Sequence, residues 1–305
     1  MNKILLIKHG SLGDIIFSLP VMYSICNHFK TSEIDLLTEK KYTSFLNLPL
    51  YFTNIIEDNR SSNILISSKI LFKISQKKYD LIIDLQNSSR TTYYNIFFRF
   101  FSNSKISSSR KFSHFRYTIP TQGTETATQG LFNQIKILGI NKVSNLMYPW
   151  LEESVHKRYN KFVLMIPGVS ANGFHKQWDP FKFAKLAKYF ENKNYMICII
   201  GTKADNESVA PIIKSCKNLI NNIDKSPPKT IYSIAKKSNL IISNDTGPGH
   251  IASLSMKNIL WIVNDNKVSN ANIDKNKTNY IISAKKINDI SVEHVINFIE
   301  INKLL

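Results

Sequence analysis

The chain has 305 residues and a formal net charge of +18 at pH 7, with 43% hydrophobic and 20% charged residues. This composition is that of a globular protein and excludes wholesale disorder, and the length allows two packed domains or one large α/β domain. The excess of Lys and Arg indicates either an anionic partner or a coding bias that spreads Lys over the surface. Such a partner would be a nucleic acid, a phosphorylated glycolipid or an anionic membrane.

Cysteine usage and hydropathy bear on location. Cys26, Cys198 and Cys216 lack the spacing of a metal or redox motif, so we expect a reducing, cytoplasmic location. The apolar run at residues 4–7 is too short for the core of a signal peptide. No stretch approaches the roughly 20 apolar residues of a membrane span. We therefore expect a soluble or peripheral protein.

Short β-branched runs alternate with helical patterns in the first half of the chain, as in parallel α/β proteins. The expected strands are residues 3–8, 34–37, 54–57 and 79–85. The expected helices are residues 12–29, 40–46, 65–77 and 88–101. A polar stretch follows at residues 102–128, and a further helix at about 130–138 ends at Gly139.

The same alternation restarts after residue 150. The expected elements are strands at residues 161–166, 195–200, 240–243 and 258–263, and helices at 180–192 and about 291–302. The last of these helices could pack back on the first domain. Two series of similar length predict two Rossmann-like domains that face one another, residues 1–150 and 151–305.

The first of three glycine-containing loops, residues 8–14 (KHGSLGD), follows a strand and opens a helix. Its glycines allow a tight turn and leave backbone N–H groups free at the helix start to bind an anion. The GxGxxG fingerprint is missing, which disfavours a nicotinamide-dependent dehydrogenase. Asp14 would repel a phosphate and is better suited to accept a proton from an attacking hydroxyl. Alternatively, Asp14 only caps the helix.

The second loop, residues 166–178 (IPGVSANGFHKQW), again joins a strand to a helix. Small and hydroxyl residues such as Ser170, followed by Lys176, suit a diphosphate because they offer backbone donors and one mobile positive charge. An ordinary surface loop with an incidental lysine is the alternative.

The third loop, residues 243–250 (SNDTGPGH), precedes a helix of small residues. Thr246 and Gly247 could present a hydroxyl and N–H groups to a phosphate. Asp245 could cap the turn, and His250 could instead be a core residue. Each loop alone is a weak signal. Together they predict a ligand site, because ligands in open α/β sheets bind at the carboxyl ends of the strands.

Two further patterns lie between residues 88 and 116. Five aromatic residues recur at helical spacing, which indicates either a core stripe or a face that enters lipid headgroups: Tyr93, Tyr94, Phe97, Phe98 and Phe101. Four basic residues lie in a Ser-rich stretch and are either a solvated charge run or a phosphate-binding group: Arg110, Lys111, His114 and Arg116.

Four segments carry a family resemblance. Residues 8–20 (KHGSLGDIIFSLP) resemble the amino-terminal signature of the bacterial ADP-heptose:lipopolysaccharide heptosyltransferases. Residues 166–187 resemble their donor-phosphate loop, residues 244–253 (NDTGPGHIAS) their DTG-x-x-H loop, and residues 79–92 (YDLIIDLQNSSRTT) their DLQG segment. The likeness covers nearly the whole chain in order and spacing, and the two carboxyl-domain loops are quite specific together.

The resemblance implies a GT-B fold with the acceptor site in the first domain and the donor site in the second. It also implies inverting, metal-independent transfer, in which Asp14 matches the proposed general base and Lys176 the donor-phosphate lysine. The donor-binding candidates are Gly13, Ser170, Lys176, Asp205, Asp245, Thr246, Gly247 and His250. The acceptor-binding candidates are Gln86, Arg110, Lys111, His114 and Arg116.

The activity implied is transfer of heptose from ADP-heptose to a lipopolysaccharide core or lipid A-linked acceptor. The enzyme would be cytoplasmic and peripheral at the inner membrane, with no metal, no further cofactor and no nucleic-acid partner. Two alternatives stay open: a related transferase that uses another nucleotide-sugar, and a nucleic-acid-binding protein, which only the charge favours.

Two departures from the family pattern are evident. Asn87 stands where a glycine is usual, and Asn264-Asp265-Asn266-Lys267 replaces a turn rich in Gly and Pro. The second departure lies near the expected donor pocket, so it leaves the identity of the donated sugar open.

Overall fold

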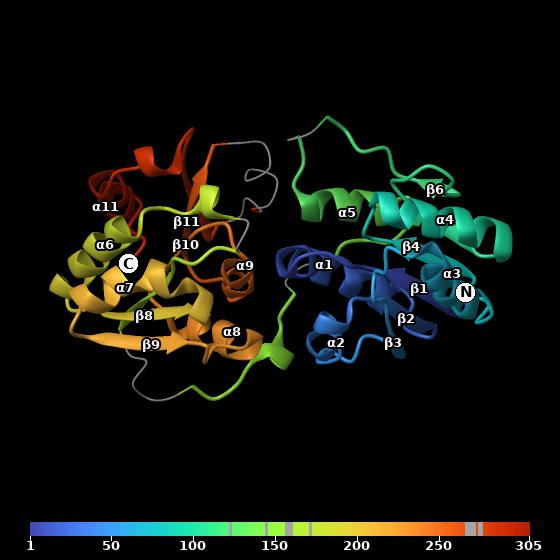
Figure 1. The fold of residues 1–305 in the computed structure, drawn as a ribbon, viewed down its shortest axis with the longest axis horizontal. Helices are drawn as coiled ribbons and strands as arrows, with labels where there is room; N and C mark the ends of the chain where they lie inside the picture. Colours follow the sequence, from blue (N-terminus) through green and yellow to red (C-terminus); the bar gives the residue numbers. More distant parts are fainter. Residues whose placement is uncertain (122–123, 144–145, 156–160, 171–172, 266–272, 274–276) are drawn as a thin grey trace. The chain divides into compact units, whose positions relative to one another are not determined.

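The computed structural model describes the chain apart from residues 122–123, 144–145, 156–160, 171–172, 266–272 and 274–276. The chain divides into two compact units, Met1–Met147 and Tyr148–Leu305 (Figure 1). Each unit contains its own six-stranded sheet with helices packed against it.

The first unit has the strand order β3-β2-β1-β4-β5-β6, and every pairing is parallel. Its strands are β1 (Lys3–Ile7), β2 (Glu33–Thr38), β3 (Asn54–Glu57), β4 (Leu81–Asp84), β5 (Lys105–Ser108) and β6 (Phe115–Arg116). Its helices are α1 (Leu12–His28), α2 (Lys40–Leu46), α3 (Ile64–Ser75), α4 (Ser89–Phe101) and α5 (Ala127–Lys136). Helix α1 packs with α5, and α3 packs with α4.

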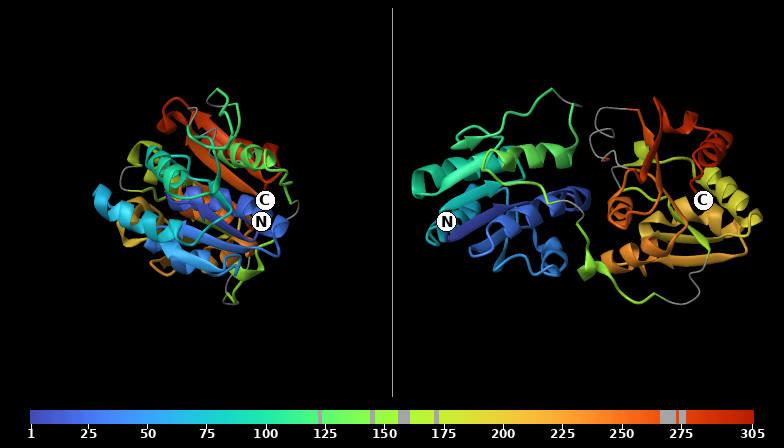
Figure 2. Two further views of the ribbon diagram at one scale, coloured as in Figure 1. Left: turned by 90° about the vertical axis from the view of Figure 1, so that its right-hand side faces the viewer. Right: turned by 180° about the vertical axis from the view of Figure 1, so that it is seen from behind.

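The second unit has the order β12-β11-β10-β7-β8-β9, again with parallel pairings (Figure 2). Its strands are β7 (Phe162–Ile166), β8 (Met196–Gly201), β9 (Leu219–Ile223), β10 (Leu240–Ser243), β11 (Ile259–Asn264) and β12 (Asn279–Ala284). Its helices are α6 (Pro180–Asn192), α7 (Asn206–Ser215), α8 (Pro228–Lys237), α9 (Gly247–Ser253) and α11 (Val292–Ile301). Short 3-10 helices lie at Pro149–Leu151, Phe174–Lys176, Lys203–Asp205 and Ile287–Asp289.

The central strands are almost wholly apolar because helices cover both faces of a parallel sheet. In the first unit, Leu5 and Ile7 of β1 pack in one core with Phe98 of α4. In the second, Val163 of β7 packs with Phe190 of α6. These rigid layers fix the loops that follow each strand, which is where the polar side chains gather.

The α/β fold class expected from the sequence is confirmed, and α2, β3, α6 and β10 have the expected bounds. Strands β5 and β6, however, lie in the stretch that was expected to be an irregular polar loop. Strand β5 lacks an apolar pattern because Ser107 and Ser108 are buried in it. Asn95 of α4 donates a hydrogen bond to the Ser108 hydroxyl at 3.1 Å, which compensates for its burial.

The carboxyl-terminal helix α11 packs in the core of the second unit. Its residues Val292, Val295 and Ile299 are buried in the core of the second unit. On the surface, Glu300 accepts hydrogen bonds from Tyr189 and Lys193 of the α6 region, both at 2.8 Å. The apolar face of α11 is therefore used within its own unit.

The aromatic stripe of α4 is divided between core and surface. Tyr94 and Phe98 are buried, which confirms the core interpretation for these two residues, whereas Phe101 is exposed. Phe100, which follows Phe98 by two residues, points away from the core and is 77% exposed.

We expect Phe98→Ala to lower the free energy of unfolding by about 3–5 kcal/mol, because it leaves a cavity in the first unit's core. Phe100→Ala is the matched control and should change the free energy of unfolding by no more than about 0.5 kcal/mol. Urea unfolding followed by circular dichroism measures both. Equal losses in the two variants would contradict the packing of α4.

Candidate functional site

The strand order of the first unit reverses between β1 and β4, and this is the position at which open α/β sheets bind ligands. The loops after these two strands are joined by a hydrogen bond. The backbone N–H of His9, after β1, donates to Gln86 Oε1, after β4, at 3.0 Å. Gln86 therefore lies at the switch point, beside the loop that leads to Asp14.

Asp14 is fixed by a capping box at the start of α1. Its Oδ2 accepts hydrogen bonds from Ser11 N at 2.8 Å and from Ser11 Oγ at 3.0 Å. Gly10 has a φ of +113°, and a Cβ there would lie 2.6 Å from Asp14 Oδ2. Asp14 therefore does cap the helix. Among the described residues, its Oδ1 makes no hydrogen bond, and the side chain is half-buried.

Lys8 was not among the expected site residues, yet it lies at the same switch point. Its side chain is buried, and Nζ donates to the Leu85 carbonyl at 3.2 Å. Burial lowers the pKa of Lys8, while the charges of Asp14 and Asp84 oppose that shift. The Lys8 amino group thus lies at the switch point, where the charges of Asp14 and Asp84 favour its protonated form.

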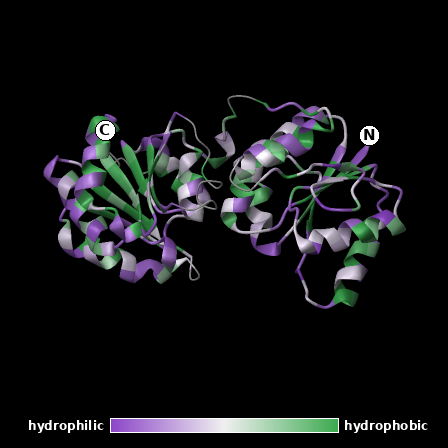
Figure 3. Ribbon diagram, turned by 90° about the horizontal axis from the view of Figure 1, so that it is seen from above, coloured by the Kyte–Doolittle hydropathy of each residue, from purple (hydrophilic) through white to green (hydrophobic). Residues whose placement is uncertain are grey.

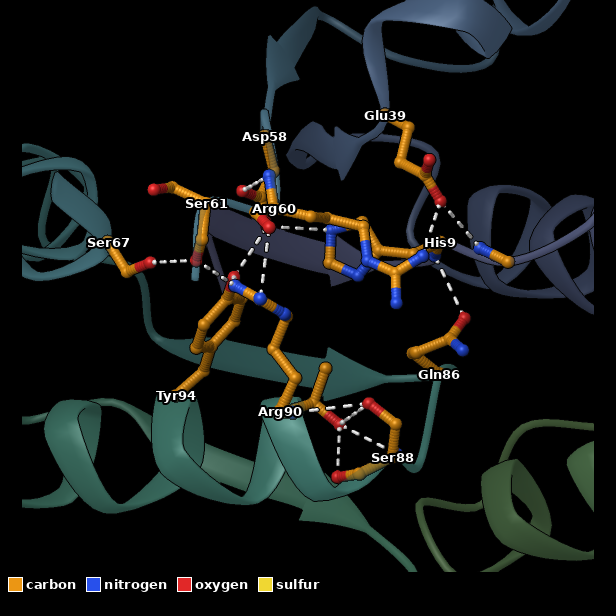
Figure 4. A network of polar contacts seen from close by, with 12 residues as sticks. His9, Glu39, Asp58, Arg60, Ser61, Ser67, Gln86, Ser88, Arg90 and Tyr94 are labelled. Carbon is orange, nitrogen blue, oxygen red and sulfur yellow. Dashed lines mark hydrogen bonds and ion pairs between the residues drawn. The ribbon is translucent and has the colours of Figure 1, made fainter. Parts of the chain in front are cut away.

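A polar network extends from His9 across the carboxyl ends of β2 and β3 (Figure 4). His9 Nε2 lies 3.0 Å from Asp58 Oδ2, and the Tyr94 hydroxyl donates to the same oxygen at 2.6 Å. Burial alone would raise the pKa of Asp58, but the contacts with His9 and Tyr94 lower it to about 2. Asp58 therefore holds the loop after β3 against the loop after β1.

Glu39 forms the second half of this network. Its Oε1 accepts hydrogen bonds from Gly10 N at 3.2 Å and from Arg60 Nη1 at 2.9 Å. Arg90 of α4 donates to the Arg60 carbonyl at 3.0 Å (Figure 4). The sequence reasoning missed these residues. A signal was available, because Asp58 directly follows the expected strand 54–57 and Glu39 lies two residues after the expected strand 34–37.

Asn87, which departs from the family pattern, has a physical explanation. Its φ is +53°, in the left-handed region that glycine adopts freely and that Asn tolerates better than most residues. Its side chain donates to Gln134 of α5 at 2.7 Å and accepts from the Ser109 N–H at 2.7 Å. Asn87 therefore preserves the backbone turn and ties the loop after β4 to the one after β5.

The basic stretch forms an ordered turn between β5 and β6, next to Ser109. Arg110 Nε donates to Thr92 of α4 at 2.7 Å. Lys111, His114 and Arg116 are exposed. Burial lowers the pKa of His114, and the nearby charges of Arg99 and Lys105 add to that shift. Arg110, Lys111 and Arg116 therefore present positive charge next to Ser109, which is hydrogen-bonded to Asn87.

In the second unit the strand order reverses between β7 and β10, and the expected donor residues lie on the loops after these strands. Lys176 Nζ pairs with Asp245 Oδ2 at 2.8 Å, and His250 Nε2 lies 2.9 Å from Asp245 Oδ1. Burial alone would raise the pKa of Asp245, but His250 and Lys176 lower it. His250 is buried and stacks on Trp261, with ring centroids 4.9 Å apart, so it is both a core residue and a partner of Asp245.

The side chain of Asn244 joins the same two loops by hydrogen bonds to backbone groups. Its amide donates to the Pro167 carbonyl at 2.8 Å and accepts from the Trp178 N–H at 3.2 Å. The Trp178 indole is anchored by the Ile290 carbonyl at 2.9 Å. The segment that carries Lys176 is therefore held by these hydrogen bonds, and the Lys176 ammonium group is held by Asp245.

Asp205, on the loop after β8, lies against the β7 loop. Its Oδ2 accepts hydrogen bonds from Thr202 N at 2.8 Å and from Thr202 Oγ1 at 3.0 Å, a second capping box. A Cβ on Gly168 would lie only 2.1 Å from Asp205 Oδ1, so this position requires glycine. The structure thus brings Asp205 to the same edge of the sheet as Lys176.

The remaining candidate residues differ in their location and exposure. Ser170 is exposed, and Thr246 and Gly247 are partly exposed at the start of α9. Gly13 lies in the first unit, on the buried side of the first turn of α1. Within the departure from the family turn, Asn264 donates to the His175 carbonyl at 2.6 Å, whereas Asn266 and Lys267 lie outside the described residues.

Within the described part of the chain, no group of three or more His, Cys, Asp or Glu side chains is arranged to hold a metal ion. The cations at the second site are side chains: Lys176 and, when protonated, His250. Such a site suits an anionic ligand that is bound by Lys and backbone N–H groups.

Comparison with known proteins gives a consistent result. The model of glycosyltransferase family 9 (heptosyltransferase) matches residues 68–260. A lipooligosaccharide heptosyltransferase 2 of Campylobacter jejuni serotype O:6 is 25% identical over 257 residues, which cover 80% of this chain and 75% of that protein.

Two solved structures share the fold over nearly their whole length. The E. coli heptosyltransferase WaaC with ADP-2-deoxy-2-fluoro heptose has a TM-score of 0.78 at 15% identity, covering 98% of this chain and 99% of that one. A family 9 glycosyltransferase from Veillonella parvula has a TM-score of 0.80 at 19% identity, covering 99% and 97%. The GT-B fold class is thereby confirmed. The chain is a glycosyltransferase and belongs to glycosyltransferase family 9 (heptosyltransferase).

Proposed function

We propose that this enzyme transfers heptose from ADP-heptose to a phosphorylated inner-core acceptor of lipopolysaccharide, with inversion at the anomeric carbon. The observation that carries the proposal is the Lys176–Asp245 ion pair at the switch point of the second unit, with Asp205 beside Gly168 on the neighbouring loop after β8. These residues offer a cation for a diphosphate and a carboxylate for the hydroxyls of a nucleoside. The names of the relatives support heptose as the transferred sugar.

In this proposal the second unit binds the donor and the first unit binds the acceptor. The acceptor hydroxyl attacks the anomeric carbon, the bond to the diphosphate breaks, and ADP departs. Asp14 takes the proton of the hydroxyl through Oδ1, while the Ser11 hydrogen bonds to Oδ2 hold the carboxylate in place. Lys176 offsets the charge that develops on the leaving diphosphate, without a metal ion.

The acceptor is attached to lipid, so the proposed place of action is the cytoplasmic face of the inner membrane. No described helix is long and apolar enough to cross a membrane. Isothermal titration with ADP, UDP, GDP and NAD tests the donor. Tight binding of UDP without binding of ADP would instead favour a transferase that uses a UDP-sugar.

We expect Asp14→Asn to lower turnover by about 10²–10⁴-fold and to leave the affinity for ADP unchanged, because the amide cannot take up the proton. Steady-state kinetics and titration with ADP measure these effects. Asn can still accept the Ser11 hydrogen bonds, so the stability should change little.

Asp205→Asn is the matched control, since Asp205 occupies the same position in the other capping box. This variant should weaken ADP binding more than it slows turnover at saturating donor. Near-normal turnover of Asp14→Asn would exclude Asp14 as the base.

We expect Lys176→Ala to weaken ADP binding and lower turnover, because it removes both the cation that faces the diphosphate and an ion-pair partner of Asp245. Lys193→Ala, which removes a surface lysine paired with Glu300, should change neither. Wild-type activity should persist in a chelator such as EDTA. An absolute requirement for a divalent ion would overturn the assignment.

We expect the triple variant Arg110→Ala, Lys111→Ala, Arg116→Ala to raise the acceptor KM and leave the donor KM unchanged. It should also lose most of the salt dependence of the wild type, since exposed charges are screened by salt. The control with the same charge change, Lys214→Ala, Lys217→Ala, Lys225→Ala in the second unit, should leave the acceptor KM unchanged. If the first variant has the same acceptor kinetics as the wild type at low salt, the basic stretch is only a solvated charge run.

A further inference from the structure

Helices α3 and α4 expose large apolar side chains that nothing in the described chain covers. On α3 these include Leu65 (73% exposed) and Phe72 (55%), and on α4 Phe100 and Phe101 (61%). Ile64 and Ile66 at the start of α3 are exposed as well. Figure 3 shows hydrophobic (green) and hydrophilic (purple) residues side by side on the helices of the unit that carries the N label. Clustered exposed apolar residues of this kind mark an interaction surface.

These residues form one face that spans both helices. Leu65 and Phe72 are seven residues apart, so they lie on the same side of α3. Ser68, between them, is hydrogen-bonded to the Tyr93 hydroxyl of α4 at 2.6 Å, which joins that side of α3 to α4. Next to this contact, the rings of Phe97 and Phe101 stack with centroids 4.7 Å apart. We call this surface the α3–α4 face.

The segment of the chain that contains the α3–α4 face is strongly basic. Residues 59–124 hold eleven Lys and Arg but only two acidic residues, Asp80 and Asp84, which gives +9 of the total charge of +18 in about a fifth of the chain. Asp84 is buried, and Asp80 accepts hydrogen bonds from the backbone of Asn2 and Lys3. Such an uneven distribution does not follow from a coding bias that acts on the whole chain.

Three of these cations lie on the two helices of the face. Lys69 and Lys73 lie on α3 on either side of Phe72, and Arg99 directly precedes Phe100. All three are exposed, and none makes an ion pair with a described residue. The face therefore combines apolar side chains that can enter a bilayer with cations at the level of the headgroups.

We propose that the α3–α4 face docks the enzyme on an anionic phospholipid membrane. A second copy of the chain is a poor occupant, because each copy carries +18 and the two helices of the face add exposed cations of the same sign. A nucleic acid would use the cations but would leave Ile64 and Leu65 without a role. The inference deepens the proposed function, since a membrane-bound acceptor requires the enzyme to reach the lipid surface.

Sedimentation with vesicles tests the proposal, using phosphatidylethanolamine with phosphatidylglycerol against pure phosphatidylcholine. The wild type should bind the anionic vesicles, and more weakly at high salt. The apolar variant Leu65→Ser, Phe72→Ser, Phe100→Ser, Phe101→Ser should lower the partition coefficient by about tenfold or more. The charge variant Lys69→Gln, Lys73→Gln, Arg99→Gln should lose a similar factor on anionic vesicles only.

The matched control places four serines at exposed apolar positions of the second unit: Phe181, Ile213, Met256 and Ile301. This control should bind vesicles as the wild type does, and circular dichroism should verify that all variants fold. Equal loss of binding in the control, or unchanged binding of the α3–α4 variants, would overturn the proposal. So would a preference of the face for single-stranded DNA over vesicles.

A soluble, delipidated acceptor separates this proposal from the proposed function. With that acceptor, the α3–α4 variants should retain the turnover of the wild type, because the substituted residues are not part of either candidate site. Transfer to the soluble acceptor without vesicle binding by the wild type would contradict membrane docking alone. Vesicle binding without transfer from any ADP-sugar would contradict the proposed function alone.

Discussion

Every strand pairing described in this chain is parallel, and this constraint determines where its chemistry can lie. Parallel strands require covering helices on both faces, so the strands are apolar and carry few functional groups. All strand-to-helix loops then emerge at one edge of each sheet. The side chains that carry chemistry, such as Asp14 in one unit and Lys176 in the other, are confined to that edge.

Both units use the same local device to orient a carboxylate. Asp14 and Asp205 each accept hydrogen bonds from the N–H and hydroxyl of a residue three positions earlier. Each also occupies space that a Cβ would need on a neighbouring glycine, Gly10 or Gly168. A carboxylate held in this way loses little further freedom when a ligand arrives, which favours precise recognition or proton transfer. Each of these two carboxylates can therefore cap its helix and also serve in the proposed chemistry.

The positively charged side chains of the protein have two distinct arrangements. At the candidate sites, cations are held by carboxylates: Arg60 by Glu39, and Lys176 by Asp245. On the α3–α4 face, cations are exposed, lack acidic partners among the described residues and stand beside apolar side chains. The first arrangement gives a defined geometry for a small anionic group. The second gives a diffuse attraction suited to an extended anionic surface.

The sequence by itself determined the fold class, most helices and strands, and the loops around Asp14, Lys176 and Asp245, because these follow from local hydrophobic patterns and strand-to-helix junctions. It did not predict β5, where Asn95 of α4 donates a hydrogen bond to the buried Ser108, or the core position of α11. Nor did it find the network of His9, Asp58 and Tyr94. These features depend on contacts between residues far apart in the chain, and only the tertiary structure brings such residues together.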